Sequence, residues 1–180
     1  MMQMQLPRIF RDTISTISTE APYLLAMADF KGQTPLMLVA EQGDAKLVEI
    51  MIEAGADPAA QDCRGKTALH AAIVKGHKAV VDVLLKHPEC ATKETVFGET
   101  PAHSAALAGD ADTLEKLLSM APDLADAQSV HGTPLERAEA FLKPDVRKEF
   151  SNHAKQNGVK VGDEHEIRAC VSILKQYTSA

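Results

Sequence analysis

The chain has 180 residues and a formal net charge of -6 at pH 7, so its length fits one domain and its charge argues against a basic nucleic-acid-binding face. Only 4% of the residues are aromatic and Trp is absent, a composition that suits short helices packed through Leu, Val and Ala. No apolar run approaches the ~18 residues that a membrane span needs, and residues 1–11 lack the apolar stretch of a signal peptide.

Residues 1–28 precede the first clear repeat. A rough helical stripe of apolar side chains occurs here, formed by Ile9, Phe10, Ile14 and Ile17. The helix is predicted to end at Ala21-Pro22, and residues 21–24 share an Ala-Pro-x-Leu pattern with residues 121–124. We interpret this segment as a degenerate leading unit that covers the apolar side of the stack behind it.

Three sets of residues then recur with a spacing of 33 residues. They are Thr34, Thr67, Thr100 and Thr133; Gly32, Gly65 and Gly98; and Gly43, Gly76 and Gly109. A fixed period in this range is typical of stacked-repeat architectures, in which each unit contacts only its neighbours.

The repeated segments carry pieces of one longer pattern: Gly-x-Thr-Pro-Leu-His-x-Ala-Ala, then Gly-His, an aliphatic run and Gly-Ala-Asp. In the second copy these pieces are Gly65, Thr67, Leu69-His70, Ala71-Ala72, Gly76-His77 and the aliphatic run at 80–85. On these residues the chain resembles the ankyrin-repeat family over residues 29–142. The resemblance implies an all-α ankyrin-repeat solenoid, built from helix-turn-helix units with β-hairpin-like fingers.

We expect one domain over residues 1–180, with three clear repeats, a degenerate fourth and capping helices at both ends. The divisions are an N-terminal capping helix at 1–28, repeats at 29–61, 62–94 and 95–127, a degenerate repeat at 128–162 and a C-terminal capping helix at 163–180. In each copy a Gly suits a finger turn with positive φ, and the Thr that follows suits a helix N-cap. Isolated helices of this length are marginal in water, so stacking must supply the burial that stabilises them.

The fourth copy departs from the pattern. Thr133 and Glu136 form a Thr-x-x-Glu capping box, but Leu142 stands where the earlier copies have Gly, and Pro144 cannot continue the helix. One interpretation, which we favour, gives this unit an outer helix ending near Asn157-Gly158, followed by an extra capping helix at 164–177. The alternative treats 143–162 as an insertion and makes 164–176 the outer helix.

Catalytic and metal chemistry find little support in the sequence. His70 and His103 occupy the position at which ankyrin repeats carry a hydrogen-bonding His that ties a finger to a helix, so we interpret both as structural. The run from Asp163 to Glu166 is acidic and contains a His, but acidic residues at a helix start are explained by the helix dipole. No nucleophile, phosphate-binding or zinc motif is present, so we expect no catalytic, cofactor-binding or metal-binding residue and no enzyme activity.

A partner protein is the expected ligand, because ankyrin-like stacks bind through finger tips and the concave face of the first helices. Mapped onto this chain, the predicted partner-binding residues are Phe30, Lys31, Arg64, Lys66, Val74, Lys75, Val96, Phe97, Leu107, Val130 and Phe141. The basic residues among them cluster around the first two units. Of the apolar ones, Phe30, Val96, Phe97 and Val130 lie on fingers, and Val74, Leu107 and Phe141 are expected on the exposed face of the first helices. We therefore expect a partner surface that is acidic near one end and apolar further along.

The sequence thus predicts a non-catalytic interaction module with an adaptor, inhibitor or effector-type role, favoured as a monomer, with no nucleic-acid or membrane partner. The alternative is an enzyme, or a protein that binds a small ligand or metal, through a pocket in the irregular region 141–177 around His153 and His165. Three Cys without Cys-x-x-Cys spacing (Cys63, Cys90 and Cys170) are expected to be free thiols, which indicates a reducing, cytoplasmic location.

Overall fold

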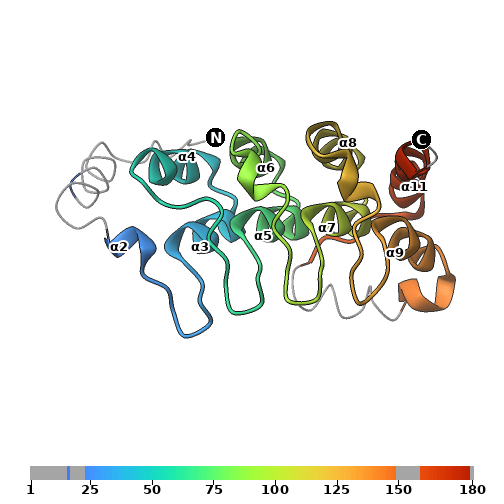
Figure 1. The fold of residues 1–180 in the computed structure, drawn as a ribbon, viewed down its shortest axis with the longest axis horizontal. Coiled ribbons are helices and arrows are strands. Elements are labelled where there is room, and N and C mark those ends of the chain that lie inside the picture. Colours follow the sequence, from blue (N-terminus) through green and yellow to red (C-terminus); the bar gives the residue numbers. More distant parts are fainter. Residues whose placement is uncertain (1–15, 17–22, 149–158, 179–180) are drawn as a thin grey trace, which may run out of the picture.

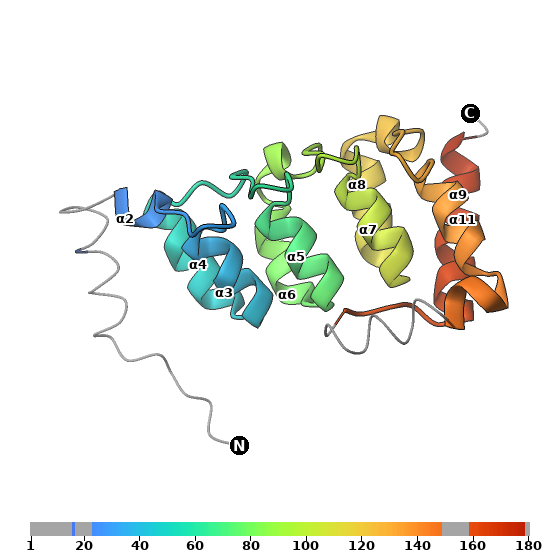
Figure 2. The same cartoon turned by 90° about the horizontal axis from the view of Figure 1, so that it is seen from below.

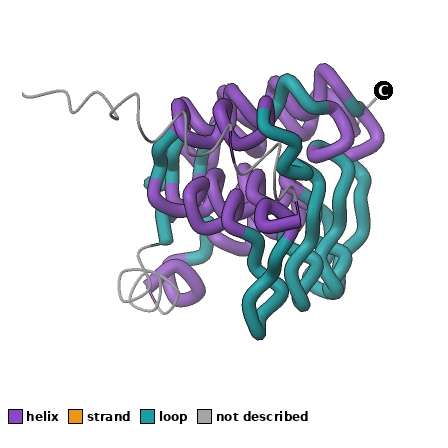
Figure 3. The backbone as a smooth tube through the Cα atoms, turned by 90° about the vertical axis from the view of Figure 1, so that its left-hand side faces the viewer, coloured by secondary structure: helices purple, strands orange, loops and turns teal. Residues whose placement is uncertain are grey.

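The structure is a computed structural model that describes Thr16 and residues 23–148 and 159–178. In these ranges the helices form two rows, with turns that project as fingers along one edge (Figures 1 and 3). The inner row contains α3 (Pro35–Gln42), α5 (Ala68–Lys75), α7 (Pro101–Ala108) and α9 (Pro134–Phe141). The outer row contains α4 (Ala45–Glu53), α6 (Lys78–Leu84), α8 (Ala111–Met120) and α11 (Glu164–Thr178).

Three short elements lie before or between these helices. The single turn α2 (Tyr23–Ala26) precedes the first inner helix and buries Leu25. The 3-10 turns η1 (Pro88–Cys90) and η2 (Pro122–Ala125) follow α6 and α8 and lead to the next finger. Most of the helix predicted within residues 1–28 lies outside the described residues.

The inner helices begin and end where the 33-residue period predicts. The hydroxyl of Thr34 accepts a hydrogen bond from the backbone N–H of Met37 at 3.4 Å, which caps the start of α3. Gly43 ends the same helix in the left-handed conformation, with φ at 85°, and donates its N–H to Val39 and Ala40 carbonyls. A residue with a Cβ is disfavoured there, so the periodic Gly sets the length of the helix.

Each outer helix presents an apolar stripe to the inner row. The equivalent residues Val48, Val81 and Leu114 are all buried, and α4 and α8 begin at the equivalent N-caps Asp44 and Asp110. Neighbouring inner helices pack on one another, and each packs on its own outer helix, so one continuous core runs through the stack. The all-α solenoid that the resemblance implied is confirmed.

The fourth unit differs from the arrangement that we favoured from the sequence. Asp163 follows Asp110 by 53 residues, which is 20 more than the repeat period of 33. Helix α11 packs against α9 and α8, and buries Ile167, Cys170 and Leu174. It therefore occupies the outer-helix position of the fourth unit, and residues 143–162 are an insertion. The predicted boundary at residue 163 falls between α9 and α11, two helices that pack as one unit.

The structure describes both ends of the insertion. Residues 144–148 are helical, and residues 159–162, which we call the strap, pass along the C-terminal ends of α5 and α7 (Figure 2). The end of the outer helix expected near Asn157-Gly158 lies outside the described residues. None of the helices in the described ranges combines the length and the hydropathy that crossing a membrane requires.

Candidate functional site: the groove and fingers of the inner-helix face

The fingers are tight turns held by their own side chains. In the first finger the carboxylate of Asp29 accepts hydrogen bonds from the backbone N–H groups of Lys31 and Gln33, at 2.8 and 2.9 Å. In the second finger Asp62 does the same for Arg64 and Lys66, both at 2.8 Å. In each finger the carboxylate fixes the backbone beneath the exposed side chains, so these side chains project from a rigid turn.

Backbone hydrogen bonds also join each finger to the next. The N–H groups of Cys63, Val96 and Val130 donate to the carbonyls of Lys31, Arg64 and Phe97, each at 2.9 Å. Only an isolated bridge between Ser129 and Gly132 resembles β structure among the described finger residues. The fingers therefore form one hydrogen-bonded edge, although they contain no regular strand in those ranges.

Two buried histidines tie this edge to the inner helices. The Nδ1 of His70 accepts the backbone N–H of Thr67 at 3.3 Å, while its Nε2 bonds to the carbonyl of Glu99 in the next finger at 3.2 Å. His103 repeats both bonds, with Thr100 and Gly132 as partners. Because a carbonyl only accepts, Nε2 carries the proton and Nδ1 does not.

The electrostatics of these rings agree with a structural role. Burial lowers the pKa of His70 from 6.5 to about 4, and burial also lowers the pKa of His103. Both imidazoles are therefore neutral at physiological pH, with both nitrogens occupied by hydrogen bonds. The interpretation of His70 and His103 as residues that tie a finger to a helix is confirmed.

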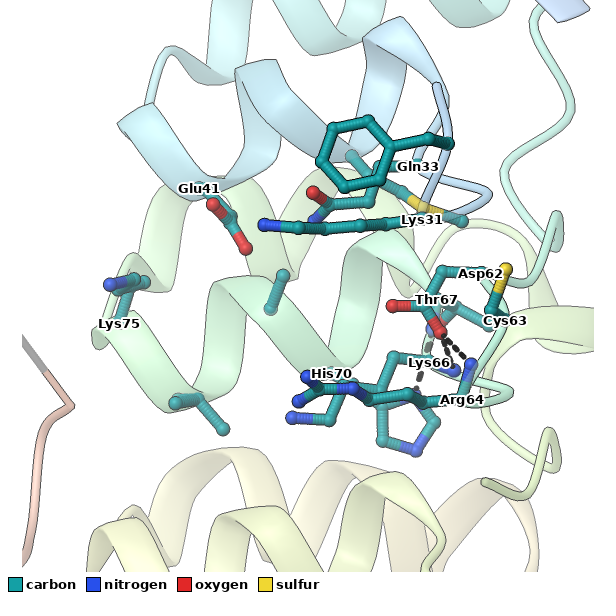
Figure 4. Close-up of a pocket in the computed structure, with 14 residues that line it drawn as sticks. Lys31, Gln33, Glu41, Asp62, Cys63, Arg64, Lys66, Thr67, His70 and Lys75 are labelled. Carbon is teal, nitrogen blue, oxygen red and sulfur yellow. Dashed lines mark hydrogen bonds between the residues drawn. The ribbon is translucent and has the colours of Figure 1, made fainter. Parts of the chain in front are cut away.

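A groove opens between the first two fingers and the inner helices α3 and α5 (Figure 4). Its volume is about 440 Å3. The predicted partner-binding residues that line it are Phe30, Lys31, Arg64, Lys66, Val74 and Lys75. The other lining residues, Met37 and Ala71 among them, were not among the predicted binding residues. Ala71 lies one helical turn before Val74, so the helical period could have found it.

The charge of this groove is mainly positive. Lys31, Arg64 and Lys66 pair with no carboxylate among the described residues, and the Nζ of Lys31 lies 5.4 Å from the ring centroid of Phe30. The acidic lining residues are Glu41 and Asp62, and the Asp62 carboxylate is occupied by the finger N–H groups. The groove therefore presents cations to solvent on a protein whose net charge is -6.

Three lysines of the outer row, in contrast, form ion pairs. Lys78 pairs with Asp112 at 2.8 Å, Lys86 with Glu49 at 2.9 Å and Lys116 with Asp82 at 2.6 Å, each across neighbouring units. These exposed cations are neutralised within the stack. The groove cations Lys31, Arg64 and Lys66 differ from these three lysines because they gather in one groove without a carboxylate partner in the described chain.

The first, third and fourth fingers carry exposed apolar side chains. The exposed fractions are 89% for Phe30, 64% for Val96, 50% for Phe97 and 69% for Val130. Phe97 makes an edge contact with the ring of His131, with centroids 6.5 Å apart, but half of its side chain stays accessible. Beside it, Glu99 pairs with Arg137 and with His131, so the acidic charge of this finger is compensated.

Two of the predicted binding residues, Phe141 and Leu107, do not line the groove. Phe141 was predicted to lie on the exposed face of a first helix, but it is buried in the core with 5% exposure, and that prediction is wrong. Its equivalent one unit earlier, Ala108, is also buried, so this position of the inner helix faces inward in both units. Leu107 is partly buried and lines a second, smaller cavity of about 160 Å3 together with Val74 and Val159 of the strap.

The acidic run at 163–166 begins a helix. The backbone N–H of Asp163 donates to the carboxylate of Glu166, and the N–H of Glu166 donates to Asp163, both at 2.8 Å. Glu164 pairs with Arg168 at 2.7 Å. Within the described ranges no group of three or more His, Cys, Asp or Glu could hold a metal ion, and His153 lies outside those ranges.

The cysteines of the described chain are free, and two of them are shielded. Cys63 is exposed on the second finger, whereas Cys90 and Cys170 are buried. Burial raises the pKa of both buried thiols to about 12, which keeps them protonated and unreactive.

Repeated caps, a two-row stack and an open inner-helix face define a helical repeat solenoid. Residues 17–95 match a family model described as ankyrin repeats (3 copies). Residues 17–95 are therefore similar to ankyrin repeats, and the units after residue 95 keep the same caps and finger bonds. A comparison with curated proteins found no match. Ankyrin repeats are generally protein–protein interaction modules, and the family is typically non-catalytic.

Proposed function

We propose that this chain is a non-catalytic interaction module that binds a partner protein through the groove of units one and two and the apolar finger tips. One observation carries the proposal: the groove cations Lys31, Arg64 and Lys66 lie together with no carboxylate partner in the described chain, whereas Lys78, Lys86 and Lys116 of the outer row are paired. Uncompensated charge on an otherwise acidic surface favours an acidic partner and speeds its association.

The apolar finger tips supply the second half of the surface. Phe30 stands at the mouth of the groove, and Phe97 and Val130 lie on successive fingers that are joined by backbone hydrogen bonds. Exposed apolar and aromatic side chains on one edge are typical anchors of protein interfaces. A partner that is acidic near the groove and apolar along the fingers fits this arrangement.

Rigidity is part of the proposal. The fingers are held by side-chain turns, by one another and by His70 and His103, so the surface exists before the partner arrives. A preformed surface binds with little loss of conformational entropy. Such a surface suits an adaptor, an inhibitor or an effector, in which binding is itself the function.

The test is affinity capture from source lysate with the wild-type chain and the double variant Arg64→Glu with Phe97→Ala. We expect the variant to lose the captured partner while its urea midpoint stays close to the wild-type value, because both side chains are exposed. The matched control is Lys46→Glu with Met120→Ala, which makes the same charge change and truncates an apolar side chain on the outer helices α4 and α8.

The control should retain the partner, and added salt should weaken capture by the wild type because exposed charges are screened. If the Arg64→Glu, Phe97→Ala variant captured the same protein as the wild type, the groove and fingers would not be the binding surface. Loss of the partner from both variants would show that charge alone, and not this face, determines capture.

A further inference from the structure

Three backbone carbonyls at the ends of inner helices occupy equivalent positions. Glu41, Val74 and Leu107 are spaced by 33 residues, and each is the second-last residue of its helix, α3, α5 or α7. The N–H groups four residues later donate elsewhere: Ala45 to Gly43, Lys78 to Gly76 and Ala111 to Gly109. These helix-end carbonyls therefore need hydrogen-bond donors from outside their own helix.

The three carbonyls receive hydrogen bonds from different donors. The Nε2 of His77, from the second Gly-His turn, bonds to the carbonyl of Glu41 at 3.0 Å. The backbone N–H of Lys160 donates to the carbonyl of Val74 at 2.7 Å, and that of Gly162 donates to Leu107 at 3.4 Å. Both of the last donors belong to the strap (Figure 2).

The sequence explains why the donors change. Position 110, which corresponds to His77 in the next unit, is Asp, and a carboxylate cannot donate. Asp110 instead caps α8, by accepting from Thr113, and pairs with Lys78 at 3.4 Å. The Gly-His turn therefore does not supply the donor for Val74, and the strap does.

The same groups also cover the periodic glycines. A Cβ on Gly43 would lie 2.6 Å from the ring of His77, one on Gly76 would lie 2.8 Å from Lys160, and one on Gly109 would lie 2.7 Å from the Cα of Gly162. At each of the three inner-helix ends, the residue that covers the Gly is the one that bonds the carbonyl two residues earlier. Carbonyl bonding and glycine contact are separate features, and they agree in all three places.

We call the hydrogen bond from His77 to the C-terminal end of α3 a clamp between neighbouring units. We propose that the strap supplies this clamp at the next two inner helices: the N–H of Lys160 holds the end of α5, and the N–H of Gly162 holds the end of α7. The strap is then a fixed part of the inner-helix face and not a displaceable lid. Its exit is fixed as well, because Gly162 leads directly into the Asp163–Glu166 cap of α11. As a consequence that rests on the proposed function, a partner reaches the C-terminal ends of the inner helices in units two and three only across the strap.

Amide hydrogen exchange on the full chain tests the clamp without reference to any partner. We expect the N–H of Lys160 to exchange about as slowly as inner-helix amides, and that of Gly162 more slowly than the finger-tip amide of Phe30. Exchange of the Lys160 amide as fast as that of Phe30 would overturn the proposal. Because no ligand is involved, this outcome is independent of whether the groove binds a protein.

A pair of glycine variants separates contact with the strap from backbone strain. Gly109 and Gly55 both have positive φ, at 68° and 98°, so Ala is strained at either, but only at Gly109 does the new Cβ meet the strap. We expect Gly109→Ala to speed exchange of the Gly162 amide by about tenfold or more, and Gly55→Ala to leave it unchanged. Equal effects of the two variants on Gly162 would overturn the proposal, and should Gly109→Ala fail to fold, the exchange rates of the wild type still decide.

Discussion

Lowering the pH should destabilise this protein through His70 well before its carboxylates titrate. The ring is buried and neutral, and its pKa falls from 6.5 to about 4 because burial disfavours the charged form. Between these two values the unfolded chain binds a proton that the folded chain does not, so stability falls as the pH is lowered. The effect begins near the unfolded pKa and is complete below the folded one.

The size of the effect follows from the shift. The full difference is worth about 3 kcal/mol, of which about 2 kcal/mol is lost between about pH 7.5 and about pH 5. His103 adds to the loss in the same direction, since burial lowers its pKa too. The lowered pKa values of Asp112, Asp163 and Glu164 contribute stability that is lost only below this range, because their ordinary values are 3.8, 3.8 and 4.5.

Urea unfolding at the two pH values measures the loss, and His70→Gln isolates its source. A Gln at this position can accept the Thr67 N–H as Glu136 accepts that of Thr133 at 2.9 Å, so the cap is kept while the titrating ring is removed. We expect the variant to lose about 1 kcal/mol at neutral pH, from the missing bond to Glu99, and to become about 2 kcal/mol less sensitive to pH. His165→Gln, at an exposed position, should keep the wild-type sensitivity.

The reasoning fails if wild type and His70→Gln lose the same free energy between the two pH values. That result would mean that the ring is hydrated or already bound to a proton in the folded state. A loss confined to values below about pH 4 would instead assign acid unfolding to the carboxylates.

Two further predictions concern the core and the thiols. Leu114→Ala, at a fully buried position, should cost about 2–5 kcal/mol in urea unfolding, whereas Leu38→Ala, 42% exposed, should cost less than about 1 kcal/mol; equal costs would contradict the assignment of the core. A thiol reagent at neutral pH should label Cys63 in the folded protein and reach Cys90 and Cys170 only after unfolding, as counted by mass spectrometry; native labelling of either buried thiol would contradict its placement.

Much of the fold could be predicted because its determinants are local and periodic. Thr34 as a helix cap, Gly43 as a left-handed stop and His70 as a finger tie each depend on a few neighbouring residues, and all recur at 33-residue steps. Six of the predicted binding residues line one groove for the same reason: once the period is known, the face of each helix is known.

One error arose where the period is interrupted. The 20 inserted residues at 143–162 moved the outer helix of the fourth unit away from its expected position, and Leu142 removed the Gly that would have marked the turn. Phe141 was misplaced because its inner-helix position faces the core. The contacts of the strap with Val74 and Leu107 depend on a backbone returning across the stack, which no local pattern encodes.

Hydrogen bonds at both ends of the inner helices explain why their face can serve as a preformed binding surface. At the N-terminal ends, the fingers are joined by backbone bonds and by the rings of His70 and His103. At the C-terminal ends, His77 and the strap bond the carbonyls of three successive helices. If the inner helices were held at one end alone, their other ends would be free to move apart. Because they are held at both ends, neighbouring helices keep their spacing. The groove between units one and two therefore has a width set by the protein and not by its partner.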